Sequence, residues 1–216
     1  MAPEVRGGSP DQSVGDILAC MSETVNRADS RREKVTAGAA ALFESAGYHS
    51  VNMTSVASAV GIAKPTLYHY FSGKEQILFS IHEEFIDLLL GKYESRRGKA
   101  LTASEELRCL INDTFELMDT LRGHVRVFFE NYRELSEQDQ VTIRAKRDRY
   151  QQIMEGTIAR GVRDGEFREV DPRLTSLAVF GMCNWAYQWY APEGELSSSA
   201  IADAFYELLL GGLASE

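Results

Sequence analysis

The side chains best suited to contact another molecule gather between residues 54 and 74. Ammonium, hydroxyl, phenol and imidazole groups follow one another closely there, on Thr54, Lys64, Thr66, Tyr68, His69, Tyr70 and Lys74. Such groups form hydrogen bonds and ion pairs with phosphate oxygens and with base edges in double-stranded DNA. No paired carboxylates, nucleophile with its base, nucleotide loop or metal-ligand set stands out in the sequence, which predicts a binding protein and not an enzyme.

Two short helices joined by a tight turn are predicted to hold these groups. Thr54 is expected to be the N-cap of the first helix, and Gly61 is expected to end it in a left-handed conformation. Pro65 suits the first turn of the second helix, which is expected to span about residues 64–71. Its length and its place after the turn make the second helix the candidate for entering a DNA groove.

The second predicted helix divides its side chains between scaffold and groove. Leu67 and Phe71 are four residues apart and are expected to face inward. Lys64 and Thr66 lie near the front of the helix and are the expected base-reading residues, with simple solvation as the alternative. Tyr68 is expected to contact a phosphate or a base, with packing as the alternative, because aromatic residues at helical spacing often belong to a core.

Four neighbouring residues carry other expectations. Tyr70 is divided evenly between DNA contact and packing, and His69 is a weaker candidate for DNA contact. Lys74 and Thr54 are expected to position the phosphate backbone. Residues 72–75 match a capping box that would place Lys74 at the positive end of the following helix.

Charge is distributed unevenly along the chain. The 216 residues have a net charge of −9, yet residues 31–80 carry five Lys or Arg against three Asp or Glu, whereas residues 81–216 carry 16 against 24. Arg31 and Arg32 precede the first predicted helix of this region and could reach a phosphate or a minor groove, or simply form an exposed basic helix start. The expected DNA-contacting residues are Arg31, Arg32, Thr54, Lys64, Pro65, Thr66, Tyr68, His69, Tyr70 and Lys74.

A longer pattern surrounds the two short helices. It consists of Phe43, Gly47, Tyr48, Thr54, Val56, Ala57, Val60, Gly61, Leu67, Tyr68, Tyr70, Phe71, Lys74 and Leu78. With these residues, the stretch from about residue 31 to residue 80 resembles the TetR family of bacterial one-component repressors. The resemblance implies an Ω-shaped homodimer, a variable ligand-binding C-terminal domain, and release of a palindromic DNA operator when the ligand binds.

The sequence predicts an all-α fold of about nine to ten helices in three parts. Residues 1–30 are expected to be an N-terminal arm with a flexible start and an extra short helix. Residues 31–78 are expected to form a three-helix helix-turn-helix DNA-binding domain, and residues 79–216 a ligand-binding and dimerisation domain. Caps, apolar spacing and Gly or Pro breaks predict helices at about 32–46, 73–93, 103–120, 123–135, 138–164, 172–190 and 197–210.

The last two predicted helices are unusually apolar. The helix at about 172–190 is apolar around most of its circumference, and the final helix has one continuous apolar face. Two such hairpins meeting about a twofold axis would form a four-helix bundle, so a homodimer interface is expected, with a buried monomer core as the alternative. The expected interface residues are Leu177, Gly181, Trp189, Phe205, Leu208, Leu209 and Gly212.

Apolar residues in the middle of the C-terminal part could form a ligand pocket. The candidates are Phe115, Met118, Phe129, Tyr132, Arg147, Tyr150, Met154 and Trp185, and ordinary core packing is the alternative for each apolar member. Arg147 also belongs to a basic cluster at residues 144–149. This cluster could receive phosphates or could be a solvated face paired with nearby carboxylates.

A second resemblance concerns the C-terminal part. The run N-W-A-Y-Q-W-Y at residues 184–190, followed by P-E-G at 192–194, is similar to TetR regulators of fatty-acid and sterol catabolism that respond to acyl-CoA thioesters. The resemblance implies a small hydrophobic effector of the acyl-CoA class. The alternative is a TetR-type regulator of an efflux or aromatic-degradation gene that responds to a neutral hydrophobic small molecule.

No metal, other cofactor or membrane partner is expected. Cys20, Cys109 and Cys183 are widely spaced without a C-x-x-C motif, and the four histidines are scattered. The chain has no run approaching 18 apolar residues and no basic-then-apolar start. These observations predict a cytoplasmic protein.

Overall fold

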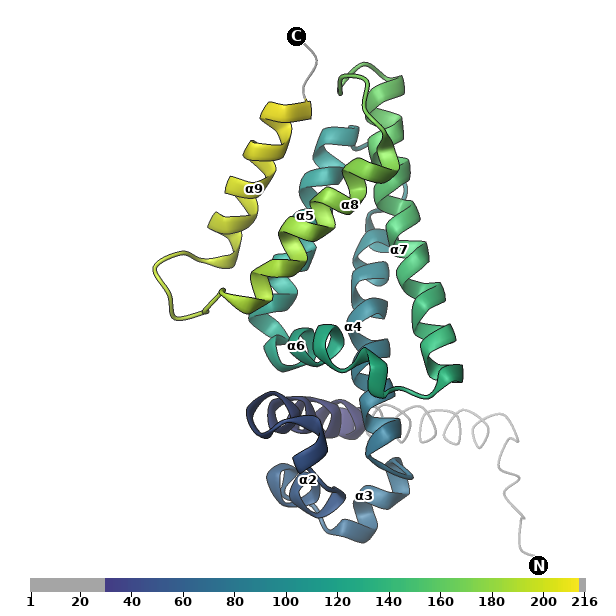
Figure 1. The fold of residues 1–216 in the computed structure, drawn as a ribbon, viewed down its shortest axis with the longest axis vertical. Coiled ribbons are helices and arrows are strands. Elements are labelled where there is room, and N and C mark those ends of the chain that lie inside the picture. The colour runs from purple at the N-terminus through teal and green to yellow at the C-terminus, as the bar shows by residue number, and fades with distance from the viewer. Residues whose placement is uncertain (1–29, 214–216) are drawn as a thin grey trace, which may run out of the picture.

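The computed structural model describes residues 30–213, and their regular elements are all helices (Figure 1). This confirms the predicted all-α class, with nine α-helices in the described range. After a helix at residues 30–46, the elements are η1 (Tyr48–Ser50), α2 (Met53–Val60), α3 (Lys64–Tyr70), α4 (Lys74–Arg96), α5 (Ala103–Thr120), α6 (Arg122–Glu130), η2 (Tyr132–Glu134), α7 (Glu137–Arg163), α8 (Pro172–Trp185), η3 (Ala186–Gln188) and α9 (Ser198–Leu213). The predicted arm, with its extra short helix, lies outside the described residues except for its last position.

The helices form a small head and a larger body that share α4. In Figure 1 the helix at residues 30–46, α2 and α3 form one end of the molecule, and α4 runs from that end into the bundle of α5, α7, α8 and α9. In the body, α5 packs against α7 and α9, while α6 packs against α4. The long α4 therefore connects the candidate DNA-binding helices to α5, α6 and α7, against which it packs.

The core of the head is built as the apolar spacing predicted. Leu67 and Phe71 are fully buried, together with Val56 of α2. Gly61 ends α2 with φ of 70°, the left-handed conformation in which a residue without Cβ is least strained. Pro65 lies in the first turn of α3, where its missing N–H costs no helical hydrogen bond.

Two predicted helix caps are wrong. Asn52, not Thr54, is the N-cap of α2, because its Oδ1 accepts hydrogen bonds from the backbone N–H of Thr54 at 2.9 Å and of Ser55 at 3.1 Å. The capping box expected at residues 72–75 is also absent. Gly73 is the N-cap of α4 without a side-chain bond, and Gln76 Oε1 instead accepts from the backbone N–H of Ser72 at 2.7 Å.

Two long helices predicted in the body are broken. The helix expected at 123–135 ends at Glu130 and is followed by the separate turn η2. The helix expected at 172–190 ends at Trp185 and continues as η3. The remaining predicted helices lie within a few residues of the observed bounds, and Thr102 opens α5 with a capping box to Glu105.

The head contacts α6 as well as continuing into α4. An added Cβ at Gly123 in α6 would lie 3.0 Å from the carbonyl carbon of Ala40, so the two helices meet backbone to backbone. Nearby, Glu84 of α4 accepts a hydrogen bond from Thr36 at 2.9 Å and lies 3.3 Å from buried His124. Burial alone would raise the pKa of the Glu84 carboxyl, but hydrogen bonds from His124 and Thr36 hold it below its usual value.

Candidate DNA-binding surface and effector cavity

The outer surface of α3 is almost entirely exposed. Leu67 is its buried residue, whereas Lys64, Pro65, Thr66, Tyr68 and His69 are exposed and Tyr70 is half-buried. Tyr68 is 48% exposed, so about half of its side chain is free to contact another molecule. A short helix held by one fully buried leucine and presenting polar groups on its other sides has the form of a recognition helix.

A groove beside α3 collects several of the expected DNA-contacting residues. Lys64 and Tyr68 of α3 line it together with Thr54 of α2 and Lys74 of α4. Thr66 lies on the other flank of α3, in a recess shared with Arg31, Lys34 and Tyr70. The groove also includes polar groups that sequence reasoning missed, on His49, Ser50, Asn52, Ser55 and Ser58. Their only signal in the sequence is a run of short polar side chains around the start of α2.

Lys74 has a structural contact in addition to its place in the groove. Its Nζ donates to the backbone carbonyls of Tyr48 at 3.3 Å and Val51 at 3.5 Å, and it lies 4.3 Å from the centre of the Tyr48 ring. The ammonium group thus braces the turn that precedes α2. A phosphate contact by Lys74 remains a prediction.

The two arginines at the start of the head contact the end of α3. Arg32 donates to the Tyr70 carbonyl at 2.9 Å and to Ser80 Oγ at 3.2 Å, with its guanidinium 4.4 Å from the Phe71 ring centre. Arg31 donates to the Tyr70 hydroxyl at 3.3 Å. Arg32 is therefore a brace of the scaffold, while exposed Arg31 and the Tyr70 hydroxyl border the recess that contains Thr66.

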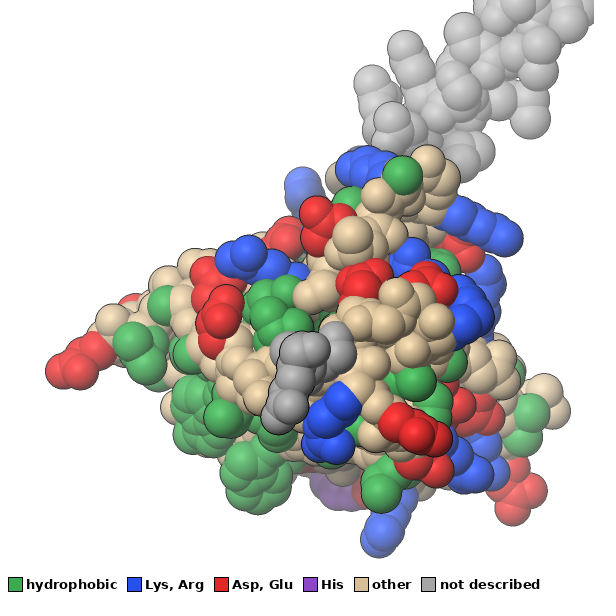
Figure 2. All heavy atoms as spheres, turned by 90° about the horizontal axis from the view of Figure 1, so that it is seen from above, with side chains coloured by type: hydrophobic (Ala, Val, Ile, Leu, Met, Phe, Trp, Pro, Cys, Tyr) green, Lys and Arg blue, Asp and Glu red, His purple; other side chains and the backbone are tan. Residues whose placement is uncertain are grey.

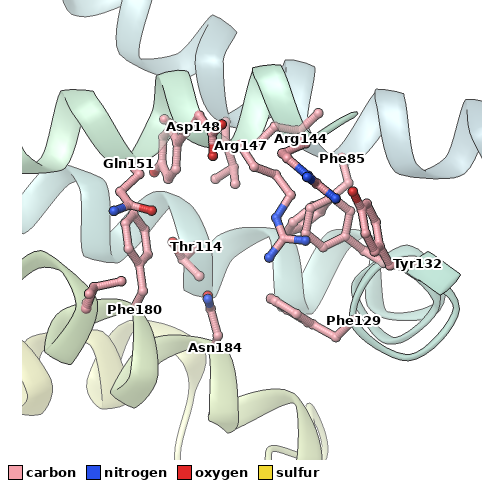
Figure 3. Close-up of a pocket in the computed structure, with 15 residues that line it drawn as sticks. Phe85, Thr114, Phe129, Tyr132, Arg144, Arg147, Asp148, Gln151, Phe180 and Asn184 are labelled. Atoms are coloured by element: carbon pink, nitrogen blue, oxygen red, sulfur yellow. The ribbon is translucent and has the colours of Figure 1, made fainter. Parts of the chain in front are cut away.

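The body contains a cavity of about 400 Å³ between α4, α5, α6, α7 and α8. It is lined by Phe85, Ile86, Leu89, Thr114, Phe128, Phe129, Tyr132, Arg144, Arg147, Asp148, Tyr150, Gln151, Leu177, Phe180 and Asn184. Figure 3 shows Arg144 and Arg147 reaching from α7 toward Tyr132, whereas Gln151, Thr114 and Asn184 lie toward Phe180. A mostly apolar cavity of this size with a few polar groups is typical of small-molecule sites.

The basic cluster of α7 is split between this cavity and the surface. Lys146 lies 2.7 Å from carboxylate oxygens of both Glu83 and Asp87. Within the described residues, neither Arg144 nor Arg147 has a carboxylate within 4.0 Å. The Arg147 guanidinium instead lies 5.3 Å and 5.5 Å from the ring centres of Tyr132 and Phe128. The solvated-face interpretation thus fits Lys146, whereas the two cavity arginines retain unpaired positive charge.

One hydroxyl group in the cavity wall is buried and unpaired. Among residues 30–213, Tyr150 Oη has no hydrogen-bond partner, although Tyr150 is only 4% exposed. Burial, and then the nearby Asp113 charge, raise the pKa of this phenol, so it remains a neutral hydrogen-bond donor. A buried unpaired hydroxyl beside a cavity suits a polar group of a bound molecule.

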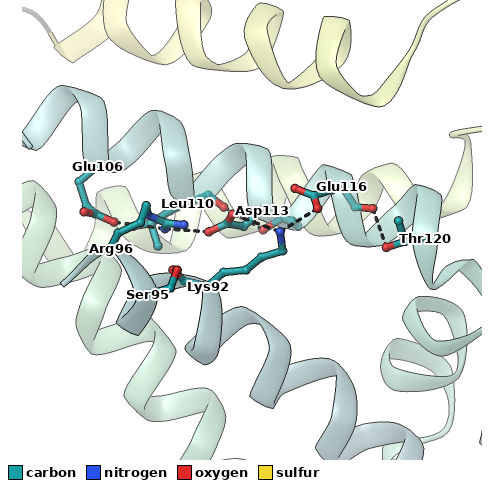
Figure 4. A network of polar contacts seen from close by, with 9 residues as sticks. Lys92, Ser95, Arg96, Glu106, Leu110, Asp113, Glu116 and Thr120 are labelled. Carbon is teal, nitrogen blue, oxygen red and sulfur yellow. Dashed lines mark hydrogen bonds and ion pairs between the residues drawn. The ribbon is translucent and has the colours of Figure 1, made fainter. Parts of the chain in front are cut away.

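An ion-pair network connects α4 to α5 behind this wall (Figure 4). Arg96 lies 2.7 Å from Asp113 and 3.3 Å from Glu106, and Lys92 lies 2.8 Å from Glu116. Burial raises the pKa of the Asp113 carboxyl, and the Arg96 guanidinium opposes that shift. Since Asp113 precedes the cavity residue Thr114, the network fixes the position of the α5 wall.

Four of the eight expected ligand-binding residues line the cavity: Phe129, Tyr132, Arg147 and Tyr150. The structure places the other four elsewhere. Phe115, Met118 and Met154 are buried outside the cavity lining, which is the core alternative, and Trp185 is 64% exposed. Sequence reasoning missed the contribution of α4, whose Phe85, Ile86 and Leu89 show the helical spacing that could have indicated it.

The hairpin of α8 and α9 exposes a large apolar surface. Leu174, Leu177, Trp185, Trp189 and Leu208 are 69%, 47%, 64%, 49% and 67% exposed. Figure 2, a view along the long axis of the molecule, shows hydrophobic side chains gathered on one side. Exposed apolar patches of this kind usually mark association surfaces.

The expected interface residues divide between this surface and the body. Leu177, Gly181, Trp189, Leu208 and Gly212 are exposed, and an added Cβ at either glycine would meet no atom within 4 Å. Phe205 and Leu209 are half-buried, and Phe205 packs edge to face on Phe115 at 5.4 Å between ring centres.

Residues 30–213 contain no group of three or more His, Cys, Asp or Glu side chains placed to hold a metal ion. No helix in that part is long and apolar enough to cross a membrane.

The chain is similar to named transcriptional regulators over most of its length. It is 28% identical over 187 residues to the HTH-type transcriptional repressor KstR2 of Rhodococcus jostii, covering 86% of this chain and 92% of the relative. The solved structure of PfmR from Thermus thermophilus superposes with a TM-score of 0.78 at 30% identity, covering 84% and 99%. AibR in complex with isovaleryl coenzyme A and operator DNA superposes with a TM-score of 0.74 at 28% identity, covering 83% and 98%.

Two family models match separate parts of the chain. The model described as "Bacterial regulatory proteins, tetR family" matches residues 35–81, which include the exposed α3 and the groove beside it. The model described as "Tetracyclin repressor-like, C-terminal domain" matches residues 100–213, which include most of the cavity and the α8–α9 surface. The chain therefore belongs to the TetR family of bacterial transcriptional regulators.

Proposed function

We propose that this protein is a homodimeric repressor that binds a palindromic operator and releases it when an acyl-CoA thioester enters the cavity. The observation that carries the effector class is the pair of arginines without a carboxylate within 4.0 Å, Arg144 and Arg147, in the wall of a mostly apolar cavity whose lining also includes Asp148. An acyl chain needs apolar walls, while the phosphates of coenzyme A need positive charge.

DNA contact is assigned to the two flanks of α3. Lys64 and Thr66 are the proposed base-reading residues, and Thr54, Tyr68 and Lys74 the proposed phosphate contacts, supported by their exposure or their place in the groove. Because Arg32 is committed to Tyr70 and Ser80, we reduce its proposed role to support of α3. Binding of chromosomal DNA would place the protein in the bacterial cytoplasm.

Dimerisation is assigned to the exposed apolar surface of α8 and α9. Large exposed apolar side chains are available there on Leu177, Trp189 and Leu208, and Gly181 would allow a second helix to approach closely. This composition is expected of a stable helical interface. A homodimer would present two copies of α3 to successive turns of a palindromic operator.

Release is assigned to movement of α4 and α6. Phe128 and Phe129 of α6 and Phe85 of α4 line the cavity, and the same two helices contact the head. A ligand that separates α6 from α7 would therefore change the position of the head. The proposed boundary between residues 78 and 79 falls within α4, which makes α4 the element shared by both domains.

The test begins with the operator. Genomic fragments retained by the full-length protein would supply it, and competition binding would then measure operator release by acyl-CoAs of increasing chain length, by coenzyme A alone and by the free acids. Each buried methylene adds about 0.8 kcal/mol, so affinity should rise about fourfold per added carbon until the cavity is full. Acyl-CoAs that bind without weakening operator affinity would refute the mechanism.

A matched pair of variants tests the charge. Arg147→Gln should weaken acyl-CoA binding about tenfold or more, because a charge-assisted hydrogen bond is lost. Arg163→Gln, on the same helix, removes the same charge from an exposed residue that is paired with Asp164 outside the cavity, and it should have little effect.

A neutral hydrophobic effector is the second candidate. It is favoured by the ring contacts of Arg147 with Phe128 and Tyr132, which give the guanidinium a partner without any anion. Under this alternative the free hydrophobic molecule releases the operator, coenzyme A esters do not, and Arg144→Gln leaves the response unchanged.

A further inference from the structure

A second recess lies where the C-terminal end of α4 meets α7. Its volume is about 520 Å³. It is lined by Tyr93, Arg96, Arg97, Gly98, Lys99, Glu106, Arg149, Gln152, Ile153, Gly156, Thr157 and Arg160. These residues form the α4–α7 recess, and none of them lines the effector cavity.

The α4–α7 recess is basic although it belongs to the acidic part of the chain. Five cationic side chains line it: Arg96, Arg97, Lys99, Arg149 and Arg160. Residues 81–216 as a whole carry 24 acidic against 16 basic groups. Such a concentration of like charge in one concavity raises the local positive potential and attracts anions.

The carboxylates nearby neutralise this charge only in part, since three of them face five cationic side chains. Glu94 is shared by Arg97 at 3.3 Å and Arg149 at 2.6 Å. Glu106 lies 3.3 Å from Arg96, which also binds Asp113 deeper in the body. Lys99 has no carboxylate within 4.0 Å among the described residues.

Arg160 holds the rim of the recess. It donates to the carbonyls of Leu101 at 2.8 Å and Thr102 at 3.3 Å, which ties the loop after α4 to α7. Gly98 in that loop has φ of 94°, a left-handed conformation that suits glycine and turns the chain just before Lys99. Lys99 therefore lies on a loop that Arg160 fixes at Leu101 and Thr102.

The wall on the α7 side is open. Gly156 is exposed, and an added Cβ there would meet no atom within 4 Å. Tyr93 and Ile153 are partly buried and give the recess an apolar side. The combination of several guanidinium groups, one ammonium group and an apolar side suits a phosphorylated molecule with a ring attached.

We propose that the α4–α7 recess binds a phosphorylated small molecule of nucleotide size that carries at least two phosphate groups. Guanidinium forks match the oxygens of phosphate in paired hydrogen bonds, and Lys99 adds a point charge without a competing carboxylate. The volume lies within the usual range for small-molecule sites. The site is separate from the proposed effector cavity and does not depend on the effector assignment.

The test uses the full-length protein at physiological salt. Pyrophosphate, ADP and adenosine are titrated into it separately by calorimetry. The proposal expects one ADP or pyrophosphate per chain and no binding of adenosine, because the phosphates supply the recognition. Absence of binding by both phosphorylated probes up to about 1 mM, or equal binding of adenosine, would overturn it.

Three variants locate the binding. Lys99→Gln and Gly156→Glu should each weaken binding of the phosphorylated probes about tenfold, the first by removing a charge and the second by adding an opposite one in open space. Arg163→Gln is the matched control, because Arg163 is an exposed α7 residue outside the recess, paired with Asp164.

One result would contradict the proposed location of the phosphates. If Lys99→Gln and Gly156→Glu bind the probes normally while Arg144→Gln does not, the phosphates occupy the effector cavity and the α4–α7 recess is no site. Thermal unfolding of each variant would confirm that it is folded, and none of the substitutions fills occupied space or removes a contact between helices.

Discussion

Gly161 in α7 allows a close approach that alanine would prevent. An added Cβ there would lie 2.2 Å from Cδ2 and 2.4 Å from Cε2 of Phe167, which is much shorter than an ordinary contact of 3.4–4 Å. Phe167 is only 2% exposed, and its backbone N–H donates to the Gly161 carbonyl at 3.0 Å, so the ring has little freedom to move away.

The expected effect of Gly161→Ala is the difference of two opposing terms. Alanine is favoured over glycine in a helix by about 1 kcal/mol. Displacing the ring costs about 1–3 kcal/mol as overpacking, or a similar amount if the phenyl group moves into water. We therefore expect a net loss of about 1 kcal/mol in the free energy of unfolding, because the cost of displacing the Phe167 ring exceeds the gain in helix propensity.

Urea denaturation of the full chain measures this loss, at one fixed protein concentration because dimerisation would make stability concentration-dependent. Gly156→Ala is the control in the same helix, and with no atom within 4 Å of the added Cβ it should stabilise by about 0.5–1 kcal/mol. In a Phe167→Ala background, Gly161→Ala should also become favourable. If Gly161→Ala stabilises the unmodified protein as much as Gly156→Ala does, the packing of Phe167 on α7 is wrong.

Three further predictions concern DNA binding, assembly and pH. Lys64→Gln should change the base preference at one position of each operator half-site. Lys74→Gln should weaken binding to all DNA sequences alike and make the slope of log K against log salt concentration shallower by about 0.9 per lost phosphate contact; an unchanged slope would exclude that contact. Leu208→Asp should yield monomers in analytical ultracentrifugation, while Val141→Asp, at a 60% exposed residue of α7, should not; dimers in both would place the interface elsewhere. Burial lowers the pKa of His82 to about 4 from 6.5, so between those values the unfolded chain binds more protons than the folded chain. The free energy of unfolding should therefore decrease as the pH is lowered from 6.5 to 4, by up to about 3 kcal/mol. If the denaturation midpoint of His82→Gln decreases as steeply over this range, His82 is not the cause.

Most helices of this fold could be predicted because their signals are local. Gly61, Pro65, Pro172 and the apolar spacing of α5 each act within a few residues. The N-cap of α2 could not be fixed in this way, because Asn52 and Thr54 are both good caps two residues apart. The structure has the asparagine there, since Ser55 completes its capping box.

The candidate site was less predictable because it depends on gaps between helices. Phe115 and Phe129 look alike in sequence, yet α9 covers the first through Phe205 while the second borders the cavity. The same limit applies to α8, where the sequence indicates an apolar helix but not which side faces solvent. Leu177 shows the ambiguity directly, since it both lines the cavity and is 47% exposed.

The contact between Gly123 and the backbone of Ala40 has a mechanical consequence. Contacts between flexible side chains absorb small displacements by changing rotamers, but two backbones in contact cannot yield in this way. A displacement of α6 toward the head is therefore expected to move the head with it, and a displacement away is expected to separate the two helices. Under the proposed release mechanism, this joint would convert the arrival of a few carbon atoms in the body into a change of spacing at the far end of the molecule.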